Sequence, residues 1–377
     1  MKTLQKQETK KIQYIDTLRG VAILMVMLVH TSQSVENLPQ LSSRLADLGK
    51  LGVQLFFILS AYTLCLSASR RGEENNQLLF FYIRRFFRIA PLYYLGIGLY
   101  GLYHTAIDAD TSYFNLQNIL ANVFFVHGFY MPANNNVVPG GWSIGTEMAF
   151  YALFPFIFYF YKQQLRNRMG ILLFPLLGLV ASLLITQLLL YSSNYTLNEN
   201  AFLYFNLFNQ LPVFLLGISY YCFTQKYKNV TLPAVSFLGP ASCYLIVLAM
   251  SILLFKDNIA INPFVAGLIF IVLLQVVKQF AFLNVQLIKR VGQLSYAMYL
   301  FHFVFAWYFS KELAKTLAPF LNPHLILLVC YLTTILATLV VAVISEKTIE
   351  RYGLALGRLL ISRIRASRVP LAEAKVR

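Results

Sequence analysis

The residues best suited to chemistry are a few ionisable side chains set in long apolar segments. Arg19 and His30 lie eleven residues apart in the apolar segment 18–34. That separation is about three helical turns, so both side chains share one helix face, roughly 16 Å apart along the axis. A histidine this far into an apolar helix is costly to place there and usually faces a cavity, which makes it a candidate functional residue. The alternative is a histidine that only makes a hydrogen bond inside a helix bundle.

A second group is the arginine cluster just before Pro91. Arg85 and Arg88 are three residues apart and share a helix face, and Arg84 flanks them. A guanidinium donates paired hydrogen bonds that match a phosphate, so the cluster suits an anion with several phosphates. The same charges also fit the ordinary excess of basic residues on the cytoplasmic side of a membrane.

A third group lies in the segment 140–151, where Glu147 follows Trp142. We expect this carboxylate at the outer end of a helix, on the same side as His30, where a carboxylate could orient an imidazole. An acid near a helix start is also favoured by the helix dipole alone. Trp142 suits an anchor at the membrane interface.

The segment 294–302 contains Tyr299 and His302 in a helix with no other ionisable group nearby. A structural hydrogen bond is the simplest role for this histidine. The sequence has no HExxH, CxxC or acidic cluster, so we expect no metal, and it lacks the glycine-rich phosphate loops and the GxSxG nucleophile motif. The cysteines are predicted to be packing residues in apolar runs, at Cys65, Cys222, Cys243 and Cys330.

The composition shows what must position these residues. Of the 377 residues, 58% are hydrophobic and only 12% are charged, against about 25% charged in soluble domains. The mean hydropathy is +0.62. These values predict an all-α, polytopic membrane protein and exclude a soluble enzyme with one anchor. The net charge of +16 is therefore read as topology and not as nucleic-acid binding.

Ten segments are long and apolar enough to cross a bilayer. They are 18–34, 51–67, 89–105, 144–161, 171–191, 207–223, 234–255, 262–280, 292–310 and 325–345. The stretch 119–131 is too short to span and is predicted to be re-entrant or interfacial. We interpret the first segment as a retained helix because no cleavage site follows it. The predicted organisation is one transmembrane domain over 1–350 and a short basic cytoplasmic tail over 351–377.

The basic residues predict the orientation. With ten spans, 26 of the 31 Lys and Arg residues fall on the side that holds both termini. That side is cytoplasmic by the positive-inside rule. The longest loop on the other side, 106–143, has no Lys or Arg.

Taken in order, these segments resemble the acyltransferase-3 family of membrane acyltransferases. The resembling motifs are DTLRGVA (16–22) with His30 after it, GVQLFFILSA (52–61), the Arg85 to Arg88 pair, WSIGTE (142–147) with FY after it, and LSYAMYLFH (294–302). The resemblance covers about 1–350. It departs from the family at Gln54, where an Asp is frequent, and at Ala61, where a Gly is frequent. The chain resembles the stand-alone form, without a C-terminal hydrolase-like domain.

The resemblance implies an O-acyltransferase in the cytoplasmic (inner) membrane. It would move an acyl group, most often acetyl, from cytoplasmic acetyl-CoA to a hydroxyl of an extracytoplasmic or lipid-linked glycan such as an O-antigen or exopolysaccharide. His30 would be the base or acyl acceptor, Glu147 would assist either His30 or the acceptor, and Arg19, Arg85 and Arg88 would bind the CoA. Further residues expected along the site are Arg84, Trp142, Ser143, Tyr151, Tyr299 and His302.

Two other function classes fit parts of the pattern. A transporter of a lipid-linked saccharide or an ion would use His30 and Glu147 as a polar relay. Inverted repeats would favour that class, and the sequence has no convincing internal repeat. An acyltransferase that acts on a small metabolite is the other alternative.

Overall fold

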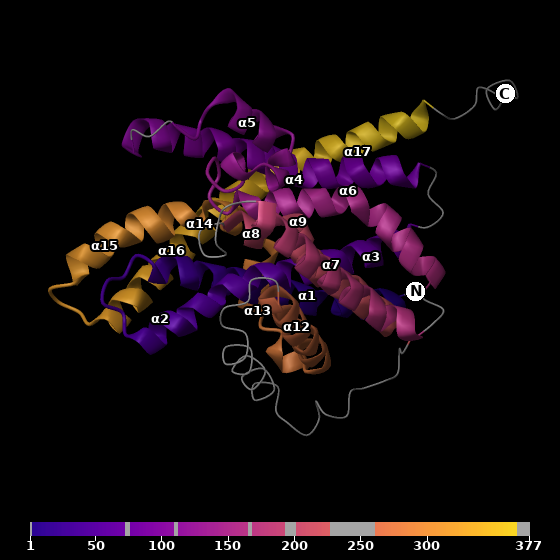
Figure 1. Cartoon of the computed structure of the whole chain (residues 1–377), viewed down its shortest axis with the longest axis horizontal. Helices are drawn as coiled ribbons and strands as arrows, with labels where there is room; N and C mark the ends of the chain where they lie inside the picture. The colour runs from indigo at the N-terminus through magenta and orange to yellow at the C-terminus, as the bar shows by residue number, and fades with distance from the viewer. Residues whose placement is uncertain are drawn as a thin grey trace, which may run out of the picture.

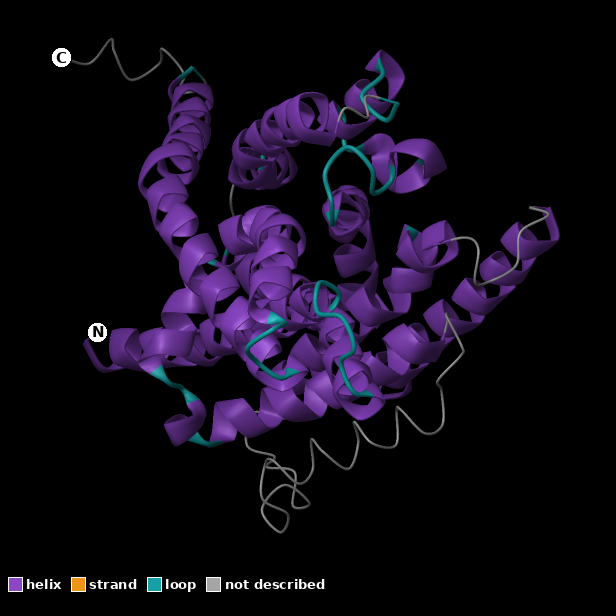
Figure 2. Cartoon of the chain, turned by 90° about the vertical axis from the view of Figure 1, so that its left-hand side faces the viewer, coloured by secondary structure: helices purple, strands orange, loops and turns teal. Residues whose placement is uncertain are grey.

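The computed structural model describes residues 2–71, 76–108, 112–164, 168–192, 201–226 and 261–367. Every regular element within these ranges is a helix, as Figure 2 shows. The all-α prediction is thereby confirmed.

Long helices and short helical turns alternate along the described chain (Figure 1). They are α1 (Lys2–Ser32), α2 (Gln40–Asp47), η1 (Leu48–Leu51), α3 (Gly52–Arg70), α4 (Gln77–Tyr103), η2 (His104–Asp108), α5 (Leu116–Val123), η3 (Val126–Phe129), η4 (Met131–Ala133), α6 (Gly141–Gln164), α7 (Arg168–Ser192), α8 (Ala201–Phe205), α9 (Leu207–Lys226), α12 (Ile261–Gln279), η5 (Ala281–Leu283), α13 (Gln286–Gln293), α14 (Ser295–Phe303), η6 (Val304–Phe309), α15 (Ser310–Leu317), α16 (Pro323–Ser345), η7 (Glu346–Glu350) and α17 (Arg351–Ala366).

The predicted spans correspond to these helices, except that 234–255 lies outside the described residues. Seven helical stretches of the described chain are long and apolar enough to cross a membrane. The helix α4 is not among them, because arginines, tyrosines and a proline lower its hydropathy. The predicted span 292–310 is divided among α13, α14 and η6. The interfacial stretch 119–131 forms α5 and two short turns.

The helix α16 shows how the bundle meets lipid. One of its faces is buried at a spacing of three or four residues and carries small and polar side chains, among them Cys330, Thr334, Thr338 and Ala342. The opposite face exposes large apolar side chains, among them Leu328, Leu332, Leu336 and Val340. Small residues inside and large apolar residues outside are typical of membrane helices, because lipid solvates the outer face.

The crossing of α1 and α13 positions one wall of the site. A Cβ atom on Gly20 would overlap the carbonyl oxygen of Ile288, and one on Gly292 would overlap that of Asp16. The two backbones are therefore in direct contact. This contact brings Gln293 and the start of α14 beside Arg19.

We expect Gly292→Ala to lower the free energy of unfolding by about 1–3 kcal/mol, because α13 must move away from α1. Thermal unfolding in detergent measures the change. The matched control is Gly98→Ala in α4, since a Cβ there meets no atom within 4 Å and alanine favours helix. Equal melting temperatures for the two variants would contradict the close crossing.

The helix α17 continues the chain past α16 and lies along α4 (Figure 1). Gly353 and Gly357 pack against Phe87 and Pro91 of α4. A Cβ atom on either glycine would lie closer to these residues than an ordinary van der Waals contact allows. Pro91 lies inside α4 and has no N–H to donate to the Phe87 carbonyl. The first part of the predicted tail is thus a helix packed on the body.

Candidate active site

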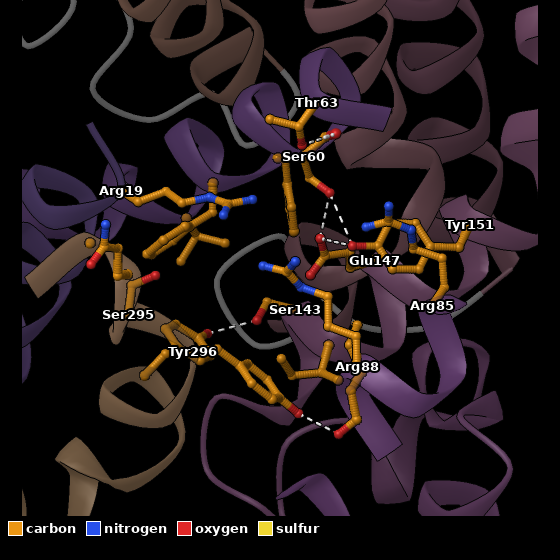
Figure 3. A pocket seen from close by; sticks show the side chains of 18 of the residues that line it. Arg19, Ser60, Thr63, Arg85, Arg88, Ser143, Glu147, Tyr151, Ser295 and Tyr296 are labelled. Carbon is orange, nitrogen blue, oxygen red and sulfur yellow. Dashed lines mark hydrogen bonds between the residues drawn. The ribbon is translucent and has the colours of Figure 1, made fainter. Parts of the chain in front are cut away.

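A cavity of about 100 Å³ lies where α1, α3, α4, α6 and α14 meet. Figure 3 shows that the labelled polar side chains come from separate helices and converge on one space. Residues far apart in sequence are therefore neighbours here. The predicted site residues that line the cavity are Arg19, Arg85, Arg88, Ser143, Glu147, Tyr151 and Tyr299.

The three arginines surround this cavity from two helices. Arg19 comes from α1, and Arg85 and Arg88 come from α4. The guanidinium groups of Arg19 and Arg88 point into the space beside Glu147 (Figure 3). The guanidinium of Arg85 lies 5.7 Å from the centre of the Tyr151 ring. Its Nε is buried and has no hydrogen-bond partner among the described residues. An unpaired donor beside a cavity is a position that an anionic ligand can satisfy.

Glu147 is fixed by two hydroxyl groups. Its Oε1 accepts hydrogen bonds from Ser60 Oγ and from Tyr151 OH, each at 2.5 Å. The Tyr151 ring also contacts the guanidinium group of Arg85. Tyr151 therefore links the carboxylate of Glu147 to the arginines in one polar cluster. The cavity is lined by three arginines and by two carboxylates, Glu147 and Glu350. The carboxylates offset part of the positive charge and leave the cavity favourable to an anion.

A wall of hydroxyl groups ends the cavity on the side of α14. Tyr299 OH lies 2.7 Å from Ser143 Oγ and 3.1 Å from the Gly140 carbonyl oxygen. Gly140 has a φ of +75°, which favours glycine, and its carbonyl turns toward Tyr299 just before α6 begins. Tyr299 also contacts the His302 ring, with centroids 5.7 Å apart.

His30 lies beyond this wall and does not line the cavity. Its ring centroid is 4.5 Å from that of Phe303, 5.3 Å from that of His302 and 5.5 Å from that of Trp307. Its Nδ1 is 3.1 Å from Gln33 Oε1. The structure therefore brings His30 and His302 together, in a cluster separate from the arginines. Arg19 and His30 do share the single helix α1.

The position of Glu147 differs from the expected one. The sequence suggested a partner for His30 at the outer end of a helix, whereas Glu147 lines the same cavity as the three arginines. The helix α6 begins at Gly141, so Glu147 lies about 9 Å further along the axis. That distance carries it past the level of the wall.

Two further predicted residues lie outside the cavity. Arg84 lines a second cavity of about 190 Å³, together with Arg71 and Lys162. Trp142 is buried, and its ring stacks on Phe205 at 4.5 Å. Its contact is thus within the bundle.

Sequence reasoning missed several polar residues of the cavity, among them Ser60 and Glu350. Ser60 lies inside the apolar segment 52–61. Its hydroxyl group in a membrane helix is the sequence feature that could have identified it as a site residue. Glu350 is a carboxylate in a basic region, and only the packing of α17 on α4 brings it to the cavity.

Gln54, which stands where the resembling family often has Asp, makes structural contacts. Its Nε2 donates to Tyr204 OH at 2.9 Å and to Gln210 Oε1 at 3.0 Å. These bonds join α3 to α8 and α9. Among the described residues, no group of three or more His, Cys, Asp or Glu side chains could hold a metal ion.

Comparison with known proteins gives a consistent family match. A family model described as an acyltransferase domain matches residues 12–343. Peptidoglycan O-acetyltransferase OatA of Listeria monocytogenes is 29% identical over 204 residues, which are 50% of this chain and 31% of that protein. Exopolysaccharide production protein ExoZ of Rhizobium meliloti is 30% identical over 110 residues, 28% of this chain and 33% of that protein.

A third relative is acyltransferase MdmB of Streptomyces mycarofaciens, 26% identical over 154 residues, 37% of each chain. The matched part of the chain spans about a third of the length of these curated relatives, between 31% and 37%. No solved structure matches the chain.

Proposed function

The chain belongs to this acyltransferase family, and from that premise we propose that it is a membrane O-acyltransferase that acetylates a hydroxyl of an extracytoplasmic or lipid-linked glycan. The donor in this proposal is cytoplasmic acetyl-CoA. Two relatives support the acceptor class, since their names refer to peptidoglycan and to an exopolysaccharide. The reaction joins the acyl carbon to the acceptor oxygen, breaks the thioester C–S bond and releases CoA as the thiol.

The observation that carries the proposal is the arginine-lined cavity beside Arg19, near the middle of α1, together with His30 near the C-terminal end of the same helix. Arg19, Arg85 and Arg88 provide planar donors for the phosphates of CoA. The axial distance from Arg19 to His30 is roughly 16 Å, comparable to an extended pantetheine arm. A CoA bound by the arginines would thus direct its thioester toward the wall of Tyr299 and Ser143 and toward His30.

In this mechanism His30 acts on the acceptor. Its imidazole takes the proton of the attacking hydroxyl, or first accepts the acyl group and passes it on. His30 then gives this proton to the CoA thiolate that leaves. The reaction therefore neither consumes nor releases a net proton and needs no metal for this step. Glu147 stays with the arginines in this scheme and helps to hold the donor end in place.

The orientation belongs to the proposal as well. The start of α1 and the end of α17 lie at the same, right-hand end of the molecule in Figure 1. Both would face the cytoplasm, where CoA is found, and the loop before α6 would face outward. We therefore propose a multi-pass protein of the cytoplasmic membrane.

A cysteine at Asn136 is expected to react with a membrane-impermeant thiol reagent in intact cells, because this exposed residue lies in the proposed outer loop. The background is a variant that lacks the native cysteines. The matched control is a cysteine at the exposed Ser362 of α17, which should react only after the membrane is opened. Labelling in the reverse order would refute the orientation.

The activity is tested by measuring alkali-labile esters on the surface glycans of cells with and without this chain. Esters that depend on the chain, and that are lost in a His30→Ala strain with normal protein levels, would support the proposal. Identical ester content in all strains would contradict glycan acylation and favour a transporter or a small-metabolite acceptor.

A further inference from the structure

Gln33 joins two ring nitrogens to one oxygen at the end of α1. The His30 Nδ1 lies 3.1 Å from Gln33 Oε1. The indole Nε1 of Trp307 donates to the same Oε1 at 2.9 Å. The His30 and Trp307 rings also meet nearly at right angles, 86°, with centroids 5.5 Å apart. One amide oxygen therefore lies between an imidazole and an indole.

This arrangement determines which atom of His30 carries the proton. An indole nitrogen can only donate, so the Gln33 amide must turn its oxygen, and not its NH₂ group, toward Trp307. That oxygen can only accept, so the His30 nitrogen facing it must be an N–H. A neutral His30 is then protonated on Nδ1, which leaves the lone pair on Nε2.

The surroundings keep the ring in this orientation. Phe303 and His302 contact His30 with ring centroids at 4.5 Å and 5.3 Å. His302 has the same tautomer, because its Nδ1 lies 2.7 Å from the Tyr299 carbonyl oxygen, which only accepts. The His302 Nε2 is buried, and no described residue bonds to it. Both imidazoles thus present an unprotonated Nε2.

We propose that Gln33 and Trp307 are positioning residues that hold His30 as the Nδ1–H tautomer, so that its Nε2 is the atom that reacts. The inference rests on the proposed acyl transfer. When the acceptor oxygen attacks the thioester carbon, its proton moves to Nε2 and the C–S bond breaks. The proton then passes from Nε2 to the CoA thiolate, which returns the ring to its starting tautomer.

The first test removes the amide. Gln33→Leu should lower kcat at least about tenfold, because His30 loses the acceptor that fixes its tautomer. The KM for acetyl-CoA should stay near that of the wild type, since Gln33 does not line the arginine cavity. Gln33 is exposed, so the change leaves no hole in the bundle. Gln33→Glu should keep most of the activity, because a carboxylate accepts from both rings. An unchanged kcat for Gln33→Leu would overturn the inference.

The second test uses the symmetry of a carboxylate. In the wild type, Trp307→Phe removes the donor that holds the amide oxygen toward His30, and kcat should fall several-fold to tenfold. In the Gln33→Glu protein the same change should lower kcat less than twofold, because both ends of a carboxylate accept. An equal loss in the two backgrounds would mean that Trp307 contributes packing alone and would overturn its positioning role.

A third measurement does not depend on activity. The ¹⁵N spectrum of histidine-labelled protein in nanodiscs, with the His30 signals assigned from His30→Asn, reads the tautomer directly. Protonation on Nδ1 in the wild type, changed in Gln33→Leu, supports the inference. Protonation on Nε2 in the wild type overturns it. A wild type that shows the Nδ1–H signal but no turnover of acetyl-CoA would refute the proposed function and leave the positioning intact.

Discussion

Replacing His30 with alanine is expected to lower acyl transfer by about 10²–10⁴-fold per folded molecule, because the reaction loses its base. Binding of acetyl-CoA should stay nearly normal. The arginine cavity that would hold the donor is lined by Tyr299 and Ser143 but not by His30. Turnover and binding of labelled acetyl-CoA by the purified variant measure the two effects separately.

Two comparisons control for loss of structure. His324→Ala changes an exposed histidine near Ser42 and should keep full activity. His302→Ala should lose less activity per folded molecule than His30→Ala, since His302 packs against the proposed base. A His30→Ala protein that melts at a lower temperature, with activity reduced only in proportion to folded protein, would assign His30 a structural role.

Arg85→Ala is expected to weaken acetyl-CoA binding about 10–150-fold, which corresponds to about 1.5–3 kcal/mol for a lost bond to a charged group. Arg85 has a buried Nε without a partner among the described residues, so a phosphate is the ligand that would complete it. Arg85→Lys should recover part of the affinity, because an ammonium cannot form the paired bonds. Isothermal titration with acetyl-CoA gives both values.

The control for this series is Arg358→Ala, which removes an exposed arginine of α17. It tests whether net charge alone accounts for the loss, and it should bind acetyl-CoA as the wild type does. If the folded Arg85→Ala and Arg88→Ala proteins bound acetyl-CoA with normal affinity, the arginine cluster would not be a CoA site. Its charges would then reflect only the excess of basic residues on the cytoplasmic side of the membrane.

Hydropathy predicted the helices well because lipid imposes a simple rule on length and polarity. It did not locate the break at Leu294, which separates α13 from the continuous helix formed by α14 and η6 in the predicted span 292–310. The helix α13 ends at Gln293, where Gly292 contacts the backbone of α1. This close contact depends on a partner helix more than 250 residues away in the chain, and no local pattern encodes it.

The sequence predicted those parts of the site in which the spacing of residues along one helix determines which side chains lie together. Arg85 and Arg88 share a face of α4 and reach one cavity, as their spacing of three residues indicated. Tyr151 lies four residues after Glu147 on the same helix α6, so their spacing was compatible with a contact. The contact with Ser60 could not be predicted, because it depends on the packing of α3 on α6. Glu350 likewise depends on how α17 lies on α4.

The tautomer of His30 shows a different limit. The sequence places Gln33 one turn after His30, but Trp307 comes from η6, far along the chain. The inference needs both hydrogen bonds, since only the indole determines which way the amide faces. Spacing along one helix could therefore suggest a contact between Gln33 and His30 and could not assign the proton.

The most direct test is the release of CoA from labelled acetyl-CoA by the purified protein in proteoliposomes that contain a glycan acceptor. We expect the wild type to release CoA and to transfer the label to the acceptor in equal amounts. We expect His30→Ala to bind acetyl-CoA and release none above background. A folded wild-type protein that neither binds acetyl-CoA nor releases CoA, or a His30→Ala protein that transfers label at the wild-type rate, would contradict transfer from the arginine cavity through His30.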